Sequence, residues 1–122
     1  MAPAYGRTRA SIIPRTRPLT PGLVRAARKD EVPPGTIREF QVDGKTTVAI
    51  SNVDGKFYAI NNTCLHRGGP LGMGQLSGKI VTCPWHNWQY DVTNGKLVAN
   101  PTVGVACYHL EVQGEDIWLD VG

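Results

Sequence analysis

Acidic residues are missing from the first 29 positions of this 122-residue chain, and long apolar runs are missing throughout. No run approaches the roughly 20 apolar residues that a membrane-spanning helix needs, so we expect no contact with a membrane. The only apolar cluster near the start, Ile12-Ile13, is too short to form the core of a secretory signal. The sequence therefore predicts a soluble protein.

Cysteine and aromatic residues are also scarce. There are three cysteines, an odd number that fits poorly with a framework of disulfide bonds. A domain of this size without such bonds is typical of a reducing compartment, and we expect a cytoplasmic location. Aromatic residues make up 7% of the chain and are not interleaved with the N-terminal arginines, so a nucleic-acid partner is not expected.

The net charge of +3 conceals two segments of opposite sign. Residues 1–29 hold seven basic groups and no acid, whereas residues 30–122 hold six basic and ten acidic groups, a net charge of −4. Four prolines and no hydrophobic periodicity in residues 1–21 predict a flexible, extended basic arm. The arm is a solvated tail, a docking element for an acidic partner, or a transit-like segment.

The remaining residues, 22–122, are predicted to form one domain. Asp43-Gly44 and Asp54-Gly55 supply the positive φ angles that tight hairpin turns require, and they divide a three-strand meander. The strands predicted along the domain are Thr36–Val42, Thr46–Ser51, Phe57–Ile60, Lys79–Thr82, Trp88–Val92, Cys107–Gln113 and Ile117–Val121. No ten-residue stretch keeps a helical spacing, so the predicted class is all-β, a small sandwich or barrel.

The strand pattern breaks between residues 61 and 88, a stretch rich in glycine and proline. Loops of this kind on a rigid β scaffold commonly carry binding sites. Cys64-Leu65-His66 stands there, followed after sixteen residues by Cys83-Pro84-Trp85-His86. Each segment offers one thiolate and one imidazole, a ligand set that suits either zinc or an iron–sulfur centre. Because zinc fingers usually pair Cys with Cys and place His with His on a helix, the spacing favours iron–sulfur, with a structural zinc module as the alternative.

These two segments resemble the ligand motifs of the Rieske family. The resemblance extends over roughly Leu23 to Val121 and is strongest from Asn61 to Lys96. It implies a small Rieske-type β fold with a two-loop cluster-binding subdomain at about residues 61–88, and one [2Fe–2S] cluster. Carried over residue by residue, Cys64 and Cys83 would ligate one iron, and His66 and His86 the other.

Within the family the chain looks like the soluble ferredoxin branch. The quinol-oxidising branch carries an extra cysteine in each loop and a serine two residues after the second histidine. Pro70, Trp85 and Trp88 stand at or near those places here, whereas Tyr90, the counterpart of a tyrosine that donates to sulfur, is retained. Two neutral imidazoles raise the potential above the roughly −400 mV of four-cysteine ferredoxins. Fewer hydrogen bonds to sulfur imply a potential below that of the quinol-oxidising group.

The resemblance implies a one-electron carrier that is not itself an enzyme. Such a carrier takes electrons from a flavin reductase and passes them to a terminal oxygenase, both docking at the His66/His86 tip, and it binds no small-molecule substrate. The alternative within the family is the small subunit of an NAD(P)H nitrite reductase. Glycines 68, 69, 72 and 74 either aim backbone N–H groups at the cluster sulfurs or serve loop geometry alone.

A second Cys-X-His sequence, Cys107-Tyr108-His109, lies in a pattern that alternates like a strand. No glycine or proline loop surrounds it, so Cys107 is interpreted as a small structural thiol and His109 as a residue on the strand surface. Trp85 either shields the cluster, contacts a partner or belongs to the core, and Trp118 is predicted to belong to the core.

Overall fold

The computed structural model describes residues 22–121, except residues 45 and 86. A six-stranded antiparallel sheet has the order β1-β9-β8-β4-β3-β2, and a three-stranded sheet has the order β5-β6-β7. The strands are β1 (Val24–Arg28), β2 (Ile37–Val42), β3 (Thr46–Val53), β4 (Lys56–Asn61), β5 (Gln75–Ser77), β6 (Ile80–Thr82), β7 (Gln89–Asp91), β8 (Cys107–Gln113) and β9 (Asp116–Asp120). Two 3₁₀ turns, η1 (Lys29–Glu31) and η2 (Leu71–Met73), are the helical elements of this described part. None of its helices is long and apolar enough to cross a bilayer.

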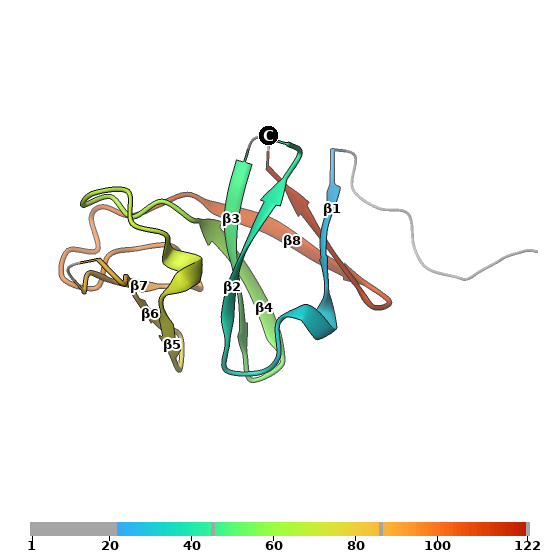
Figure 1. The fold of residues 1–122 in the computed structure, drawn as a ribbon, viewed down its shortest axis with the longest axis horizontal. Helices are drawn as coiled ribbons and strands as arrows, with labels where there is room; N and C mark the ends of the chain where they lie inside the picture. The colour runs from blue at the N-terminus through green and yellow to red at the C-terminus, as the bar shows by residue number, and fades with distance from the viewer. Residues whose placement is uncertain (1–21, 45, 86, 122) are drawn as a thin grey trace, which may run out of the picture.

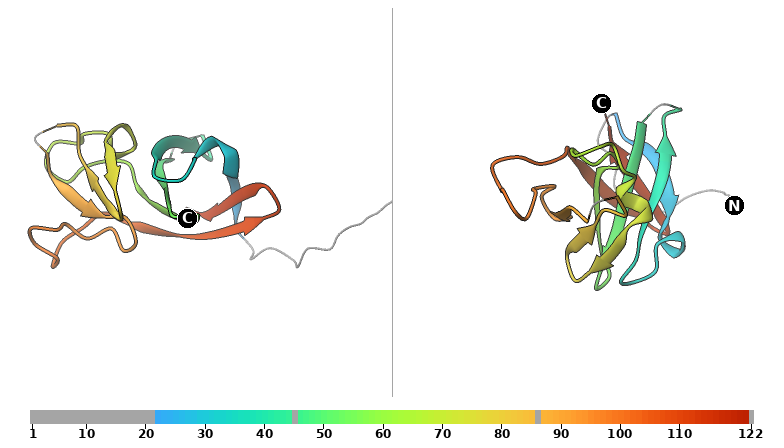
Figure 2. Two further views of the ribbon diagram at one scale, coloured as in Figure 1. Left: turned by 90° about the horizontal axis from the view of Figure 1, so that it is seen from below. Right: turned by 60° about the vertical axis from the view of Figure 1, so that its left-hand side comes forward.

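The larger sheet curls until its edge strands β1 and β2 approach each other, which gives a barrel-like body (Figure 1). The smaller sheet and its loops, residues 62–92, project from one end of this barrel, and we call them the small lobe (Figure 2). The predicted all-β class and the two-loop subdomain are confirmed. The boundary of the predicted basic arm lies outside the described residues.

The predicted meander is present, and its turns form as the Asp-Gly pairs require. Asp43 and Gly44 have φ angles of 54° and 71°, and Asp54 and Gly55 have angles of 52° and 92°. These positive angles match the twist of the flanking strands, so β2, β3 and β4 pair in sequence with no register shift. The remaining predicted strands correspond to β6, β7, β8 and β9, with small changes at their ends.

Two strands were not predicted, β1 and β5. β1 has the sequence Val-Arg-Ala-Ala-Arg, which lacks a regular two-residue alternation, and it forms by pairing with β9. The stretch from residue 61 to 88 was expected to hold only Lys79–Thr82 as a strand, but β5 also lies there and pairs with β6. Its three residues contain a single apolar side chain, Leu76, which is too little for a periodic pattern. The strand forms because Gly78, at a φ of 58°, turns the chain so that Leu76 faces Val81.

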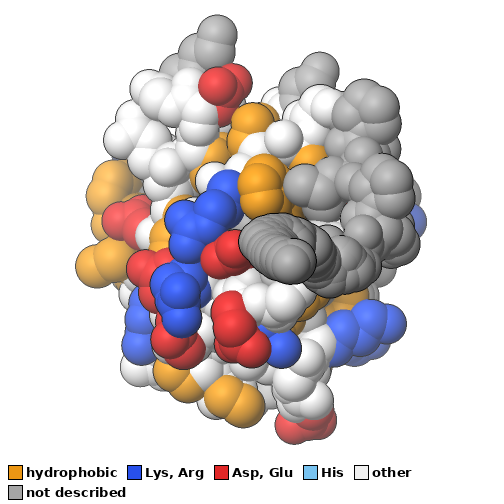
Figure 3. All heavy atoms as spheres, turned by 90° about the vertical axis from the view of Figure 1, so that its right-hand side faces the viewer, with side chains coloured by type: hydrophobic (Ala, Val, Ile, Leu, Met, Phe, Trp, Pro, Cys, Tyr) orange, Lys and Arg blue, Asp and Glu red, His pale blue; other side chains and the backbone are white. Residues whose placement is uncertain are grey.

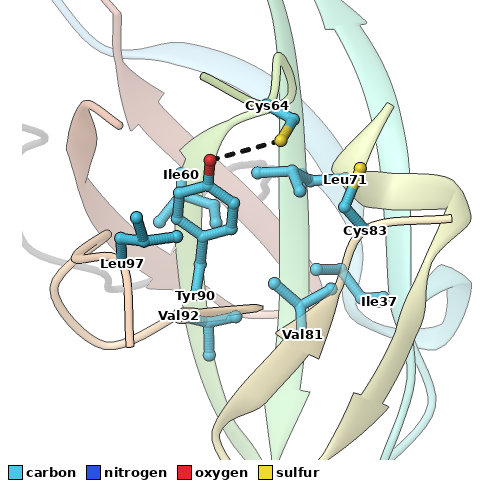
Figure 4. Close-up of a cluster of buried hydrophobic side chains, with 10 residues drawn as sticks. Ile37, Ile60, Cys64, Leu71, Val81, Cys83, Tyr90, Val92 and Leu97 are labelled. Atoms are coloured by element: carbon cyan, nitrogen blue, oxygen red, sulfur yellow. Dashed lines mark hydrogen bonds between the residues drawn. The ribbon is translucent and has the colours of Figure 1, made fainter. Parts of the chain in front are cut away.

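Two clusters of buried side chains hold the molecule together. One fills the barrel around Val48, Ile50 and Ile117. The other joins the barrel to the small lobe and includes Tyr90 and Val81 (Figure 4). The core positions of β9 are Ile117 and Leu119, whereas Trp118 between them points to the other face and is half-buried, so its predicted place in the core is wrong.

Asn52 fixes the junction of β3 with the segment that follows β1. Its buried Nδ2 donates to the carbonyl of Val32 at 2.8 Å, and its Oδ1 accepts from the Gly55 amide at 2.7 Å. We expect Asn52→Ala to lower the free energy of unfolding by about 2–3 kcal/mol, because two backbone groups lose their partners. Urea unfolding of the purified protein, followed by tryptophan fluorescence, measures this. Gln41→Ala, at an exposed position of β2, should stay within about 0.5 kcal/mol of the parent, and equal losses in both variants would contradict the assignment.

Candidate metal centre

The two predicted cysteine ligands lie at the start of two neighbouring loops of the small lobe. Cys64 lies in the loop between β4 and η2, and Cys83 follows β6 directly. Both thiols are buried, and Figure 4 shows them at the edge of the cluster of side chains that joins barrel and lobe. Burial raises the pKa of the Cys83 thiol, and the adjacent Cys64 thiol raises it further. The structure therefore brings two distant cysteines together, as predicted.

Each cysteine begins a tight turn that the backbone closes on itself. The Cys64 amide donates to the Gly69 carbonyl at 2.9 Å, and the Gly68 amide donates back to the Cys64 carbonyl at 2.9 Å. In the second loop the Cys83 amide donates to the Trp88 carbonyl at 2.7 Å. These backbone hydrogen bonds hold both cysteines in their loops.

Each of the two sulfur atoms accepts a hydrogen bond from a backbone amide of its own loop. The His66 amide donates to Cys64 Sγ at 3.4 Å, and the Trp85 amide donates to Cys83 Sγ at 3.4 Å, so in each loop the donor is two residues beyond the cysteine. Amide donors stabilise negative charge on sulfur, which the thiolate form needs. This repeated arrangement fits two thiolate ligands.

Tyr90 of β7 adds a third donor. Its hydroxyl oxygen lies 3.3 Å from Cys64 Sγ and accepts a hydrogen bond of 2.9 Å from the Leu65 amide (Figure 4). Burial raises the pKa of Tyr90 far above its ordinary value, so the phenol keeps its proton. A thiolate sulfur can only accept a hydrogen bond, so with Cys64 deprotonated the Tyr90 hydroxyl is the donor of this pair. The predicted role of Tyr90 as a sulfur donor agrees with this geometry.

Gly69 is required by the second sulfur. A Cβ atom placed on it would lie 2.7 Å from Cys83 Sγ and 3.1 Å from Trp85 Cβ, closer than non-bonded atoms approach. The neighbouring glycines have another use. Added Cβ atoms would meet the backbone of Glu39 at Gly72 and the Thr82 carbonyl at Gly74. They let the loop pack closely on β2 and β6.

Three of the four glycine amides do not point at sulfur. Those of Gly68, Gly72 and Gly74 donate instead to Cys64 O, Asn62 Oδ1 and Leu71 O, at 2.9, 2.7 and 3.0 Å. These glycines were interpreted either as aiming amides at sulfur or as serving loop geometry, and for all three the structure shows loop geometry. The sulfur donors are the amides of His66 and Trp85, which the sequence did not single out.

His66 lies at the rim of the site, with its ring stacked on that of Trp88. The ring centroids are 4.5 Å apart and the planes differ by 9°. Trp88, which stands where the quinol-oxidising branch has serine, therefore fixes the orientation of the imidazole. The fourth predicted ligand, His86, lies outside the described residues. Trp85 beside it is 49% exposed and does not belong to the core.

Asn62 is a positioning residue that sequence reasoning missed. Its buried amide donates to Glu39 Oε2 of β2 at 2.7 Å, and its Oδ1 and carbonyl accept from the amides of Gly72 and Leu71 at 2.7 Å each. These bonds tie the first loop to the barrel. The only local signal is the Asn61-Asn62 pair at the end of β4, where Asn61 also forms a side-chain turn with the Thr63 amide.

The second Cys-X-His sequence takes no part in the site. His109 lies on β8 with its side chain largely in solvent, and its Nε2 is 2.8 Å from Glu111 Oε2, so its predicted surface position is confirmed. Cys107 begins the same strand but is exposed, so its thiol is not a core group. In the described ranges, which exclude His86, no three His, Cys, Asp or Glu side chains converge as metal ligands.

The residues present fit an iron–sulfur group. Two adjacent thiols in a buried position, each facing an amide donor, provide soft ligands and donors for sulfur charge, and the His66 imidazole stands at the rim. A zinc ion would accept the same ligand types, so the donor set alone leaves that alternative open.

Comparison with known proteins supplies the family. The profile of the Rieske [2Fe-2S] domain matches residues 22–109. The ferredoxin component of naphthalene 1,2-dioxygenase/salicylate 5-hydroxylase systems from a Ralstonia species is 30% identical over 102 residues, 83% of this chain and 97% of that protein. The biphenyl dioxygenase ferredoxin subunit of Pseudomonas sp. strain KKS102 is 35% identical over 100 residues, 80% of this chain and 91% of its own. The solved ferredoxin of carbazole 1,9a-dioxygenase from Nocardioides aromaticivorans IC177 superposes with a TM-score of 0.72 at 34% identity, covering 80% of this chain and 95% of that one. The chain belongs to the Rieske [2Fe–2S] family.

Proposed function

We propose that this chain is a one-electron carrier that takes electrons from a flavin reductase and passes them to a terminal oxygenase. In this proposal it holds one [2Fe–2S] cluster on Cys64, His66, Cys83 and His86. The observation that carries the proposal is the pair of buried cysteine sulfurs, each facing the amide two residues further along. Further support comes from the relatives above, which are ferredoxin components of dioxygenase systems and which the chain matches over most of their length.

The chain's residues hold, shield and orient the proposed group. When bound, an iron–sulfur cluster supplies a centre that gains and loses one electron. Cys64 and Cys83 would provide the thiolates, and their burial excludes water from the sulfur atoms. Tyr90 keeps its proton at the hydroxyl and donates it toward Cys64 Sγ, while Trp88 keeps the His66 ring in one plane. A preformed site of this kind needs little rearrangement between two oxidation states.

Replacing single cysteines by alanine tests the ligand assignment. We expect Cys83→Ala to lose the visible absorption of the purified protein, together with its iron and labile sulfide, because one of four ligands is removed. Cys107→Ala should retain all three, since that thiol lies on β8 away from the two loops. Metal analysis of the parent decides against a structural zinc module if iron and sulfide are found without zinc. An unchanged spectrum in Cys83→Ala would refute the ligand set.

The close approach of Gly69 to Cys83 gives a second test. We expect Gly69→Ala to reduce the iron bound per chain by at least about half, because its methyl group would overlap Cys83 Sγ at 2.7 Å. Gly78→Ala is the matched control: its φ of 58° costs about 1 kcal/mol of stability, but no atom lies within 4 Å of the added Cβ. Iron content measured after identical purification compares the two. Equal loss in both variants would mean that fold stability, not contact with sulfur, is responsible.

Removing the Tyr90 hydroxyl tests the tuning of the site. A hydrogen bond that favours the more negative sulfur is worth about 1 kcal/mol, which corresponds to roughly 40 mV for a one-electron couple. We therefore expect Tyr90→Phe to lower the midpoint potential by that order, measured by redox titration followed by electron paramagnetic resonance. Tyr58→Phe removes a hydroxyl on β4 from a ring that packs against the same cluster of buried side chains, and it should leave the potential unchanged. A higher potential in Tyr90→Phe would contradict donation to sulfur.

A further inference from the structure

Acidic residues are almost absent from the small lobe and from the segments on either side of it in the sequence. Between Asp54 and Glu111 the only acid is Asp91. Its carboxylate is 17% exposed and forms an ion pair with Lys79, with 3.3 Å between Oδ2 and Nζ. Glu39 of β2 reaches the base of the lobe, where its Oε2 accepts a hydrogen bond from Asn62. The loops that carry the two cysteines therefore present no carboxylate of their own.

One positive charge remains on these loops. Arg67 directly follows His66, is exposed, and forms no ion pair with any residue in the described ranges. Because Lys79 is paired with Asp91, Arg67 is the uncompensated charge nearest the site. A charged group approaching this end of the molecule meets a local field of positive sign.

The end of the barrel opposite the lobe carries charges of both signs, and Arg25 and Arg28 there pair with Asp116 and Asp30. Residues 22–55 and 111–122 hold five basic and nine acidic groups, a net charge of −4, whereas residues 56–110 hold four basic and one acidic group. Acidic side chains at this end lie on η1 and the β8–β9 turn: Asp30, Glu31, Glu115 and Asp116. Figure 3 looks onto that end and shows acidic and basic side chains gathered there. Within residues 22–122 the acidic side chains are therefore concentrated in the barrel, whereas the segment that contains the lobe has an excess of basic ones.

Large apolar side chains near the site are exposed to solvent. Leu65, Met73 and Trp85 are 49%, 64% and 49% exposed, and all three lie on or next to the cysteine loops. Met73 also lines a depression of about 300 Å³ with Cys83 and Pro84. Exposed aromatic and methionine side chains beside a buried site are typical of the centre of a protein–protein interface.

From these observations we propose that the loop end of the small lobe docks a redox protein whose own surface is an apolar patch rimmed by carboxylates. Arg67 pairs with one of those carboxylates, and Leu65, Met73 and Trp85 pack on the apolar patch. A partner rimmed by lysines would meet Arg67 with no carboxylate on these loops to pair with. This inference rests on the proposed function, because it requires the electron to leave at the loops.

The test uses two haem proteins as probes, an acidic cytochrome b5 and a basic cytochrome c. The prereduced protein is mixed with each in a stopped-flow instrument at ionic strengths from about 20 to about 200 mM, which shortens the Debye length from roughly 20 Å to roughly 7 Å. We expect added salt to slow electron transfer to cytochrome b5 and to leave or raise the rate to cytochrome c. The affinity of the oxidised protein for oxidised cytochrome b5, measured by calorimetry, should fall over the same range.

Matched variants separate a local surface from total charge. Arg67→Glu should lower the low-salt rate with cytochrome b5 about tenfold and weaken its binding to a similar degree. Lys56→Glu makes the same change in total charge next to Gly55, which lines a depression with Asp30 and Glu115 at the end of the barrel opposite the lobe, and should stay within about twofold. Met73→Gln should weaken binding about threefold at both ionic strengths, because it removes apolar contact and no charge. The visible spectrum of each variant should match the parent.

Equal effects of Arg67→Glu and Lys56→Glu, or tighter binding of cytochrome c than of cytochrome b5 at low salt, would overturn the inference. Failure of the proposed function looks different: the protein would hold no reducible centre and would reduce neither cytochrome. The calorimetric comparison of the two charge variants would still report the sign of the loop surface in that case.

Discussion

The contact between the Tyr90 hydroxyl and the first cysteine loop is the constraint on which the site depends. The ring of Tyr90 is fully buried in the cluster of side chains that joins barrel and lobe, so its hydroxyl has to find partners inside the protein. It finds them in the Leu65 amide and Cys64 Sγ. Moving the loop away would leave a buried phenol unsatisfied, at a cost of about 1–3 kcal/mol. The Tyr90 side chain therefore both packs in the core and positions Cys64 Sγ. A movement of the loop would disturb the packing around Tyr90.

The barrel supports this arrangement from the other side. Asn62 connects the loop to Glu39, and Gly72 allows the loop backbone to lie against β2. The second loop is held by Gly74, which packs against the Thr82 carbonyl, and by Gly69, which leaves room for Cys83 Sγ. A side chain at Gly69 would overlap Cys83 Sγ, and side chains at Gly72 and Gly74 would overlap Glu39 and the Thr82 carbonyl. The loops are thus irregular in conformation but rigid in position, as a site with a fixed ligand geometry requires.

Features that depend on short stretches of sequence could be predicted, and features that depend on distant contacts could not. The Asp-Gly pairs determine their own turns and so predict β2, β3 and β4. The motifs Cys64-Leu65-His66 and Cys83-Pro84-Trp85-His86 indicate the two loops. By contrast, β5 forms only because Leu76 meets Val81, and the exposure of Trp85 follows from how the loops close. The amide donors to sulfur are backbone groups and leave no residue signature. Asn62 gave a turn signal, but nothing in the sequence indicated Glu39 as its partner, 23 positions away.

The cysteine loops carry no carboxylate of their own, and the nearby Glu39 carboxylate of β2 accepts a hydrogen bond from Asn62. This distribution has two consequences with one physical cause. Two thiolates in a buried position are costly, and each nearby carboxylate would add repulsion that the weak screening of the interior leaves largely intact. In the lobe Asp91 is paired with Lys79, and the donors next to the two sulfurs are backbone amides and the Tyr90 hydroxyl. Thiolates at these positions, as the proposed function requires, would face those donors. The same distribution leaves Arg67 as the charge that an approaching protein meets first. The preference for an acidic partner thus needs no residues beyond those that surround the site. It follows from the electrostatic conditions that allow two thiolates to be held there.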